Sequence, residues 1–250
     1  MARIMRRKNR FYDIGTSNKS FLQVATDLRR LGVDNYYFML EIKDYSLVGV
    51  NPYADNLTQD QISRIIIECT RNIWYYLREV CLIPTSGAPV RYKANRGNIA
   101  QTWCIIHGID SWLCLPRQQG KTESALAVIA WAYSFGTSHS TFIFINKDGG
   151  NAKANLGRIK AQIELLPEYM HFEVMLEEDD ATGKLKTVKS INNATSMKHS
   201  TTKNQIIIKA KATSYESALS MARGLSAPII HVDPNKFVYK YDMFVYVKPL

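Results

Sequence analysis

The sequence predicts an α/β fold: a mostly parallel sheet with helices on both faces, preceded by a helical segment. After residue 89, apolar strand-like runs alternate with helical patterns, which is typical of parallel sheets whose connections are helices. One strand-to-helix junction carries the run Gly120-Lys121-Thr122. The chain has 250 residues, of which 46% are apolar and 22% charged. This composition excludes a disordered chain or a coiled coil and allows one large domain, or one domain with an appendage.

We expect residues 1–20 to form a basic, flexible arm. Residues 1–10 hold five basic side chains and no acidic one, and the whole chain has a net charge of +10. Clustered basic residues favour a polyanionic partner, most often nucleic acid, although a solvated tail is the alternative. A second basic stretch, residues 181–211, has seven lysines and no acid, and we expect a β-hairpin or loop insertion there.

Residues 21–88 are predicted to form a helical segment. A short helix is expected from Phe21 to Leu31. Thr58, with Gln61 three residues later, has the pattern of a capping box, and the helix that it begins should run to Val80. The Pro- and Gly-containing run 84–89 ends this helix and sets the domain boundary.

Residues 89–250 are predicted to form the α/β domain. Its expected elements follow in chain order: strand 112–115, helix 121–135 closed by Gly136, strand 141–145, helix 152–166, strand 205–209, helix 215–222 and strand 228–232. The uncharged run 124–146 has about the length of a membrane span, but Gly136 to Ser140 interrupt it. A buried helix followed by a buried strand is therefore the better interpretation.

The junction at residues 115–122 has the pattern of a phosphate-binding loop. Backbone N–H groups of such a loop, here at Gln118, Gln119 and Gly120, point at a phosphate, Lys121 reaches the outer phosphates, and Thr122 binds Mg²⁺. The first glycine of the Gly-x-x-x-x-Gly-Lys-[Ser/Thr] pattern is replaced by Leu115. The alternative is a helix that only happens to begin with Gly-Lys-Thr.

A phosphate-binding loop of this kind works with an acidic strand that holds Mg²⁺. The apolar strand ending in Asp233 is the best candidate, and the alternative is that Asp233 only caps a turn with Pro234. A rival strand, 174–178, adjoins a charged run and fits a solvated turn better. The four cysteines and five histidines are scattered without zinc-ligand spacing, which makes a Cys/His metal site unexpected and fits a reducing, intracellular compartment.

Several segments together resemble the large terminase subunits of tailed bacteriophages, the motors that pump viral DNA into an empty capsid. The phosphate loop Arg117 to Thr122 is similar to theirs. The resemblance covers roughly residues 35–245. It includes the helix 154–167, the residues Arg223-Gly224 before the acidic strand, and the upstream runs 68–69, 72–75 and 77–79.

The resemblance implies a P-loop ATPase of the additional-strand, conserved-glutamate type that uses ATP and Mg²⁺. Lys121 and Thr122 would bind phosphates and metal, Asp233 would hold the metal, and Arg117 would sense or stabilise the γ-phosphate. Gln101 matches the glutamine that contacts adenine, with an ordinary helix-surface glutamine as the alternative.

The same resemblance implies partners and a location. These are double-stranded DNA, the portal protein and the small terminase subunit, in a ring oligomer that works in the host cytoplasm and is not part of the mature virion. No membrane partner is implied.

The chain departs from the family where the catalytic glutamate should directly follow Asp233, because that position is Pro234. Loss of a positioned base should slow hydrolysis by about 10²–10⁴-fold. The chain also ends 17 residues after Asp233, so we expect neither the RNase H-type nuclease domain nor DNA cleavage. A hydrolysis-dead nucleotide-, DNA- or partner-binding remnant is the second hypothesis, and another nucleic-acid-dependent ATPase such as a helicase is the third.

Overall fold

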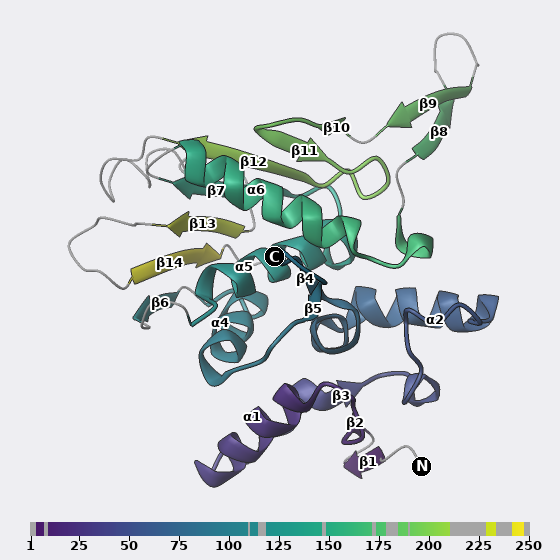
Figure 1. Cartoon of the computed structure of the whole chain (residues 1–250), viewed down its shortest axis with the longest axis vertical. Coiled ribbons are helices and arrows are strands. Elements are labelled where there is room, and N and C mark those ends of the chain that lie inside the picture. Colours follow the sequence, from purple (N-terminus) through teal and green to yellow (C-terminus); the bar gives the residue numbers. More distant parts are fainter. Residues whose placement is uncertain are drawn as a thin grey trace. The chain divides into compact units, whose positions relative to one another are not determined.

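The computed structural model divides into two compact units, which we describe separately (Figure 1). Unit 1 comprises Met1–Arg96 and Glu164–His171, and unit 2 comprises Gly97–Ile163 and Phe172–Leu250. The predicted boundary at residue 88 thus lies eight residues before the end of the first part of unit 1 at Arg96. Unit 1 also includes the segment Glu164–His171 from the middle of the chain. The structure describes residues 4–7, 10–109, 111–114, 119–146, 149–171, 174–178, 185–189, 191–210, 229–233 and 242–247.

Unit 1 is mainly helical, with small antiparallel sheets. Its strands are β1 (Ile4–Arg7), β2 (Arg10–Asp13), β3 (Glu41–Ile42), β4 (Leu82–Ile83) and β5 (Val90–Arg91). Its helices and helical turns are α1 (Lys19–Arg30), η1 (Phe38–Leu40), η2 (Tyr45–Leu47), α2 (Gln59–Arg71), α3 (Ile73–Tyr75), η3 (Tyr76–Val80) and η5 (Glu168–Met170).

The expected flexible arm is instead folded in its described part. Strands β1 and β2 form an antiparallel hairpin, and β2 continues the sheet to β3. Tyr12 is 4% exposed and packs edge-on against Tyr37 at 4.5 Å between ring centroids. The basic residues of this region therefore flank a strand whose last two residues, Tyr12 and Asp13, are buried, which a charge count does not reveal.

The capping box at the start of α2 is confirmed. The Thr58 hydroxyl accepts from the Gln61 backbone N–H at 3.2 Å, and the Gln61 side chain accepts from the Thr58 N–H at 2.9 Å. The expected continuous helix to Val80 is wrong, because Asn72 has an extended backbone (φ −147°, ψ 91°). Its side-chain oxygen caps the next helix by accepting from the N–H groups of Trp74 and Tyr75.

Unit 2 contains the larger sheet and the helices that precede and follow residues 115–120. The helices are α4 (Arg96–Ile106), α5 (Lys121–Trp131), η4 (Ala132–Gly136) and α6 (Gly149–Glu164). The strands are β6 (Ser111–Cys114), β7 (Thr141–Asn146), β8 (Val174–Glu178), β9 (Leu185–Lys189), β10 (Ile191–Asn192), β11 (Ser196–Lys198), β12 (Gln205–Ala210), β13 (Ile229–Asp233) and β14 (Asp242–Val247).

Seven of these strands form one sheet in the order β10-β11-β12-β7-β13-β14-β6. Only β12 with β7 and β7 with β13 pair in parallel, and the other four pairings are antiparallel. The sheet is therefore mixed, and the prediction of a mostly parallel sheet is wrong for its described part. The physical reason is the length of the links: residues 234–241 and 199–204 are too few for a crossover, which needs about a dozen residues.

Strand β6 nevertheless runs in the same direction as β13, because both pair antiparallel with β14 between them. In Figure 1 the arrows of β7, β12 and β13 point the same way, opposite to β14. The rival acidic strand β8 lies in a separate hairpin with β9 and is not part of this sheet. The expected hairpin character of the lysine-rich stretch agrees with the antiparallel pairings of β9, β10 and β11.

Helix α5 is the buried helix that the sequence predicts. Every residue from Ser124 to Ala130 is buried, so the helix is covered on all sides over that length. It ends in the helical turn η4, where Gly136 lies against the indole of Trp131; a Cβ built on Gly136 would stand 2.7 Å from that ring. The fully buried Asn204 joins this turn to the sheet, since its side-chain N–H groups reach the carbonyl oxygens of Tyr133 and Thr137 at 2.8 Å.

No helix within the described ranges has both the length and the apolar character that crossing a membrane requires.

Candidate nucleotide-binding site

The first turn of α5 is where the structure presents the Gly-Lys-Thr run to solvent. Gly120 is the N-cap residue and has φ +75°, in the left-handed region that glycine adopts without a steric penalty. Gln119 and Gly120 are exposed, and Lys121 and Thr122 are partly exposed, whereas every residue from Ser124 to Ala130 is buried. The Gly-Lys-Thr run therefore lies in the exposed first turn of α5.

The glycine cap leaves this helix end suited to an anion. A helix start has four backbone N–H groups without partners inside the helix, and Ser, Thr, Asp or Asn caps usually satisfy one of them. Gly120 has no side chain and makes no such cap bond. A phosphate group would accept from these donors and would also be stabilised by the positive end of the helix dipole. The local geometry thus fits an anion such as a phosphate group.

The strand register places Asp233 at the same edge of the sheet. Phe244 of β14 pairs with Val232 on one side and with Trp112 on the other. The last residue of β13, Asp233, is therefore level with Leu113, with one strand between them. Two strand spacings amount to about 10 Å. The carboxyl end of β13 and the start of the loop that follows β6 thus meet at one sheet edge.

Two further residues lie at this edge. Asn146, the last residue of β7, pairs with Asp233. Asp242, the first residue of β14, pairs with Cys114, the last residue of β6 before the predicted phosphate loop. The sequence alone does not single out Asp242, because its position beside β6 depends on the direction of β14.

Gln101 lies on α4, and its side chain is fully buried. It is therefore not an ordinary helix-surface glutamine. Adenine contact by Gln101 stays a prediction, since that contact requires the residues covering it to move. Arg117 and Gln118 lie outside the described residues, and Asp233 is placed only by its backbone register.

The structure also draws attention to Glu123, which sequence reasoning missed. Glu123 directly follows Thr122 in the first turn of α5, and one of its carboxylate oxygens accepts a hydrogen bond from the side chain of Gln162 on α6. Gln162 is 1% exposed. An acidic residue in a first helical turn is an available signal, because the helix dipole favours it there. The bond ties the turn that carries Lys121 to the neighbouring helix.

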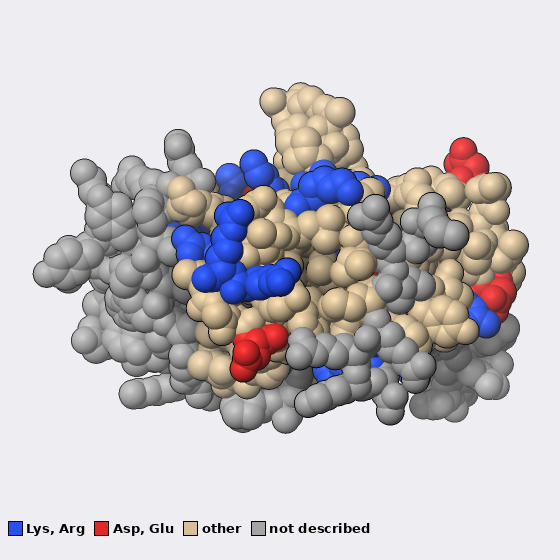
Figure 2. Space-filling view, turned by 90° about the horizontal axis from the view of Figure 1, so that it is seen from below, with Lys and Arg blue, Asp and Glu red and all other residues tan. Residues whose placement is uncertain are grey.

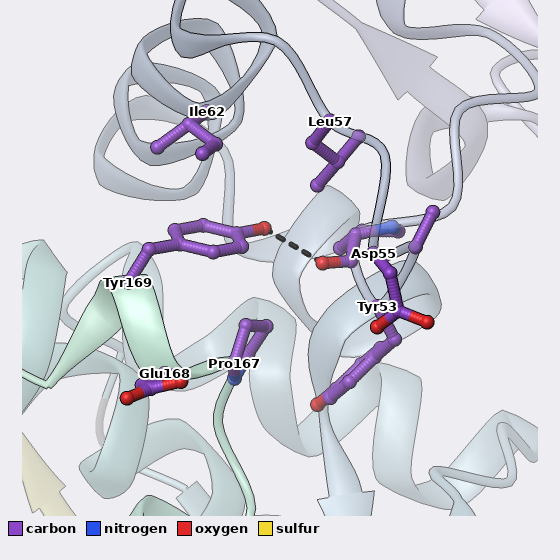
Figure 3. Close-up of a pocket in the computed structure, with 9 residues that line it drawn as sticks. Tyr53, Asp55, Leu57, Ile62, Pro167, Glu168 and Tyr169 are labelled. Carbon is purple, nitrogen blue, oxygen red and sulfur yellow. Dashed lines mark hydrogen bonds between the residues drawn. The ribbon is translucent and has the colours of Figure 1, made fainter.

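A separate open cavity of about 510 Å³ lies within unit 1 (Figure 3). The Tyr169 hydroxyl donates to the Pro52 carbonyl at 2.8 Å, and the Tyr53 hydroxyl lies 2.7 Å from the Val80 carbonyl oxygen. Burial raises the pKa of both phenols, so they stay protonated and can donate these bonds. The exposed carboxylates of Asp55 and Glu168 stand on either side of the Pro167 ring in this view. Two carboxylates repel phosphate, so this cavity does not suit a nucleotide.

Lys and Arg side chains do not merge into one stripe on the face drawn in Figure 2. They form separate groups with uncharged surface between them, and acidic side chains are interspersed. A continuous basic groove would be the clearest sign of a nucleic-acid backbone site. DNA binding therefore stays a prediction from the charge and the resemblance.

Among the residues that the structure describes, no three His, Cys, Asp or Glu side chains gather as a metal site. No family model matches the chain, and no curated protein sequence matches it either.

Proposed function

We propose that unit 2 is a P-loop NTPase domain of the additional-strand type that binds Mg²⁺-ATP. The observation that carries this proposal is the pairing of β6 and β13 with the same intervening strand, β14. This register brings the carboxyl end of the strand before Gly120-Lys121-Thr122 level with Asp233. A phosphate-binding helix start and a metal-binding aspartate on a nearby strand are the two parts that such a site needs.

Each residue has a role that its chemistry fits. The backbone at Gln119 and Gly120 and the start of α5 would bind the phosphates, and the Lys121 ammonium would neutralise their charge. The Thr122 hydroxyl and the Asp233 carboxylate supply the oxygen ligands that Mg²⁺ prefers. When bound, the metal would neutralise charge on the transferred phosphoryl group. Arg117 and Gln118 complete the proposed loop, and Gln101 is the proposed adenine contact.

The biological role that we propose is the ATPase part of a DNA-packaging motor of the large-terminase kind. Its support is the sequence resemblance together with the net charge of +10. In that role the chain would act in the host cytoplasm, as a ring on the portal protein and with the small terminase subunit, and would move double-stranded DNA into a procapsid.

Nucleotide binding is the test of the proposed site. Calorimetry with Mg²⁺ and a non-hydrolysable ATP analogue should give a saturable signal for the wild-type chain. Lys121→Ala should abolish it, whereas Lys93→Ala, which removes an exposed lysine from unit 1, should leave it unchanged. The proposal would be refuted if the folded wild-type chain bound no ATP analogue.

A hydrolysis-dead nucleotide-binding protein is the second candidate, and Pro234 favours it because proline has no carboxylate with which to orient water. The variant Pro234→Glu restores a carboxylate directly after Asp233. If the wild-type chain binds ATP without hydrolysing it and this variant hydrolyses it, only the base is missing. If neither hydrolyses it, the loss extends beyond residue 234.

A further inference from the structure

The cavity of unit 1 lies between two segments that are far apart in the sequence (Figure 3). Residues 52–62 form one wall, and residues 167–169, which follow α6 in the chain but belong to unit 1, form the other. Its volume of about 510 Å³ falls in the range of small-ligand sites, roughly 300–1,000 Å³. The cavity is therefore large enough to hold a ligand.

Hydrogen bonds from two tyrosines hold the walls together. The Tyr169 hydroxyl donates to the Pro52 carbonyl oxygen at 2.8 Å, from one wall to the other. The Tyr53 hydroxyl lies 2.7 Å from the Val80 carbonyl oxygen and 3.0 Å from that of Leu165, which comes shortly before the second wall. Because the walls are fixed in this way, little conformational freedom is lost when a ligand enters.

Much of the lining is apolar. In Figure 3 the side chains of Ile62 and Leu57 lie on one side of the Tyr169 ring, and Pro167 lies on the other. Apolar surface of this kind packs against the methylene stem of a long side chain, and the face of an aromatic ring attracts a cation. The lining thus suits a ligand that combines an apolar stem with a positive charge.

Asp55 and Glu168 supply the matching negative charge, one from each wall. Both are exposed, and within the described ranges neither forms an ion pair, whereas Asp44, Asp60 and Glu79 of the same unit each pair with an arginine. The described lining of the cavity contains no Lys or Arg. Its two carboxylates are therefore available to a cation that comes from outside.

An organic cation fits this lining better than a metal ion does. Ca²⁺ takes about six to eight oxygen ligands, and Mg²⁺ needs near-ideal octahedral geometry. Among the described lining residues only Asp55 and Glu168 carry carboxylates. A guanidinium group is planar, has several N–H donors and stacks on aromatic faces, so it can bond to carboxylates while it rests on the Tyr169 ring.

We propose that this cavity binds an arginine side chain presented by a basic segment of a partner protein. A cavity of this size accommodates a drug-sized ligand, so it has room for the side chain and for part of the backbone that carries it. The whole chain has a net charge of +10 and repels cations at a distance, so the attraction must come from Asp55 and Glu168. The inference is independent of the proposed nucleotide site.

The test uses the full chain and a fluorescent, N-acetylated and C-amidated pentapeptide with one central arginine among glycines and serines. Fluorescence anisotropy should show saturable binding. The same peptide with citrulline in place of arginine has nearly the same shape but no charge, and it should bind about tenfold more weakly. Because this comparison is made on the wild-type protein, it decides the proposal even if a variant does not fold.

Variants of the lining locate the site. Asp55→Asn and Glu168→Gln should each weaken binding of the arginine peptide by about three- to tenfold. Tyr169→Phe keeps the ring and should bind the peptide, whereas Tyr169→Leu removes the aromatic face and should weaken binding. The matched control is Asp34→Asn, which changes an exposed acid of unit 1 outside the cavity lining and should behave as wild type.

Three results would overturn the proposal: the arginine peptide does not bind, the citrulline peptide binds equally well, or Asp34→Asn weakens binding as much as Asp55→Asn does. Free arginine amide is the last probe. If it binds as tightly as the peptide, the cavity is a site for a small cation and the assignment to a protein segment is wrong.

Discussion

Arg78 and Glu79, neighbours in the chain, form an ion pair inside unit 1, with 2.9 Å between Nε of Arg78 and Oε1 of Glu79. The Arg78 side chain is fully buried, and its Nη1 also donates to the Met39 carbonyl oxygen at 2.8 Å. Glu79 additionally accepts from the Thr16 hydroxyl at 2.7 Å. The pair therefore links the helical turn η3 with the segments on either side of α1.

Removing one partner of this pair should destabilise unit 1 strongly. In Glu79→Gln the buried guanidinium of Arg78 loses its ion-pair partner, and loss of one partner of a buried pair costs about 3–5 kcal/mol. Urea unfolding should give a free energy of unfolding lower by about that amount. Asp60→Asn breaks the exposed pair with Arg64 and should change stability little. Equal losses in the two variants would contradict the assignment of Arg78 and Glu79 to a buried network.

Asp13 predicts a dependence of stability on pH. Desolvation by burial raises its pKa, the neighbouring Glu79 adds to this, and Arg78 opposes it. A carboxyl whose folded-state pKa is raised binds more protons in the folded state, so its contribution to stability is greatest below its unfolded pKa of about 3.9 and is lost as pH rises. Asp13→Asn, which can still accept from the Gly15 N–H, should therefore be more stable than wild type at pH 7.

The measurement is urea unfolding of wild type and Asp13→Asn from pH 3 to pH 8. The difference in the free energy of unfolding should shrink as pH falls toward the unfolded pKa. A difference that grows in acid would mean that the carboxylate form is the one that the fold favours.

Two glycines provide opposite predictions for the same substitution. Gly136→Ala places a Cβ against the Trp131 ring and should lower the free energy of unfolding by about 1–3 kcal/mol, as overpacking does. Gly157 lies inside α6, and a Cβ added there would meet no atom within 4 Å, so Gly157→Ala should raise stability by about 0.5–1 kcal/mol. Thermal melts of the two variants, compared with wild type, decide both signs.

Gly120 links backbone conformation to the proposed site. A Cβ at this residue meets no atom within 4 Å, but its φ of +75° is strained for any L side chain. Gly120→Ala should cost about 1–2 kcal/mol and weaken binding of the ATP analogue by changing the path into α5. If the variant binds the analogue as tightly as wild type does, the left-handed cap is not needed by the nucleotide.

Structural features that depend on residues close together in the chain could be predicted from the sequence. The box of Thr58 and Gln61, the end of the helical turn η4 at Gly136 and the strand that ends in Asp233 each depend on residues close together in the chain. The break at Asn72 was missed because the apolar pattern continues across it, and only the side-chain bonds to Trp74 and Tyr75 reveal it.

Structural features that depend on contacts between residues far apart in the chain could not be predicted from the sequence. Nothing within β14 states its direction, which is set by the short link 234–241, and the place of Asp242 beside Cys114 follows from that direction. Burial of Gln101 likewise depends on what covers α4 and not on the pattern of the helix itself.

The divided composition of unit 1 has a consequence for synthesis on the ribosome. Segment 164–171 supplies the buried side chains of Leu166 and Met170, and Tyr169 bonds to Pro52. Residues 1–96 therefore emerge from the ribosome without part of their own core and must wait until residue 171 has been made. Because translation adds about 5–20 residues per second, this interval lasts seconds. During it, the first helices of unit 2 are synthesised while unit 1 still lacks segment 164–171.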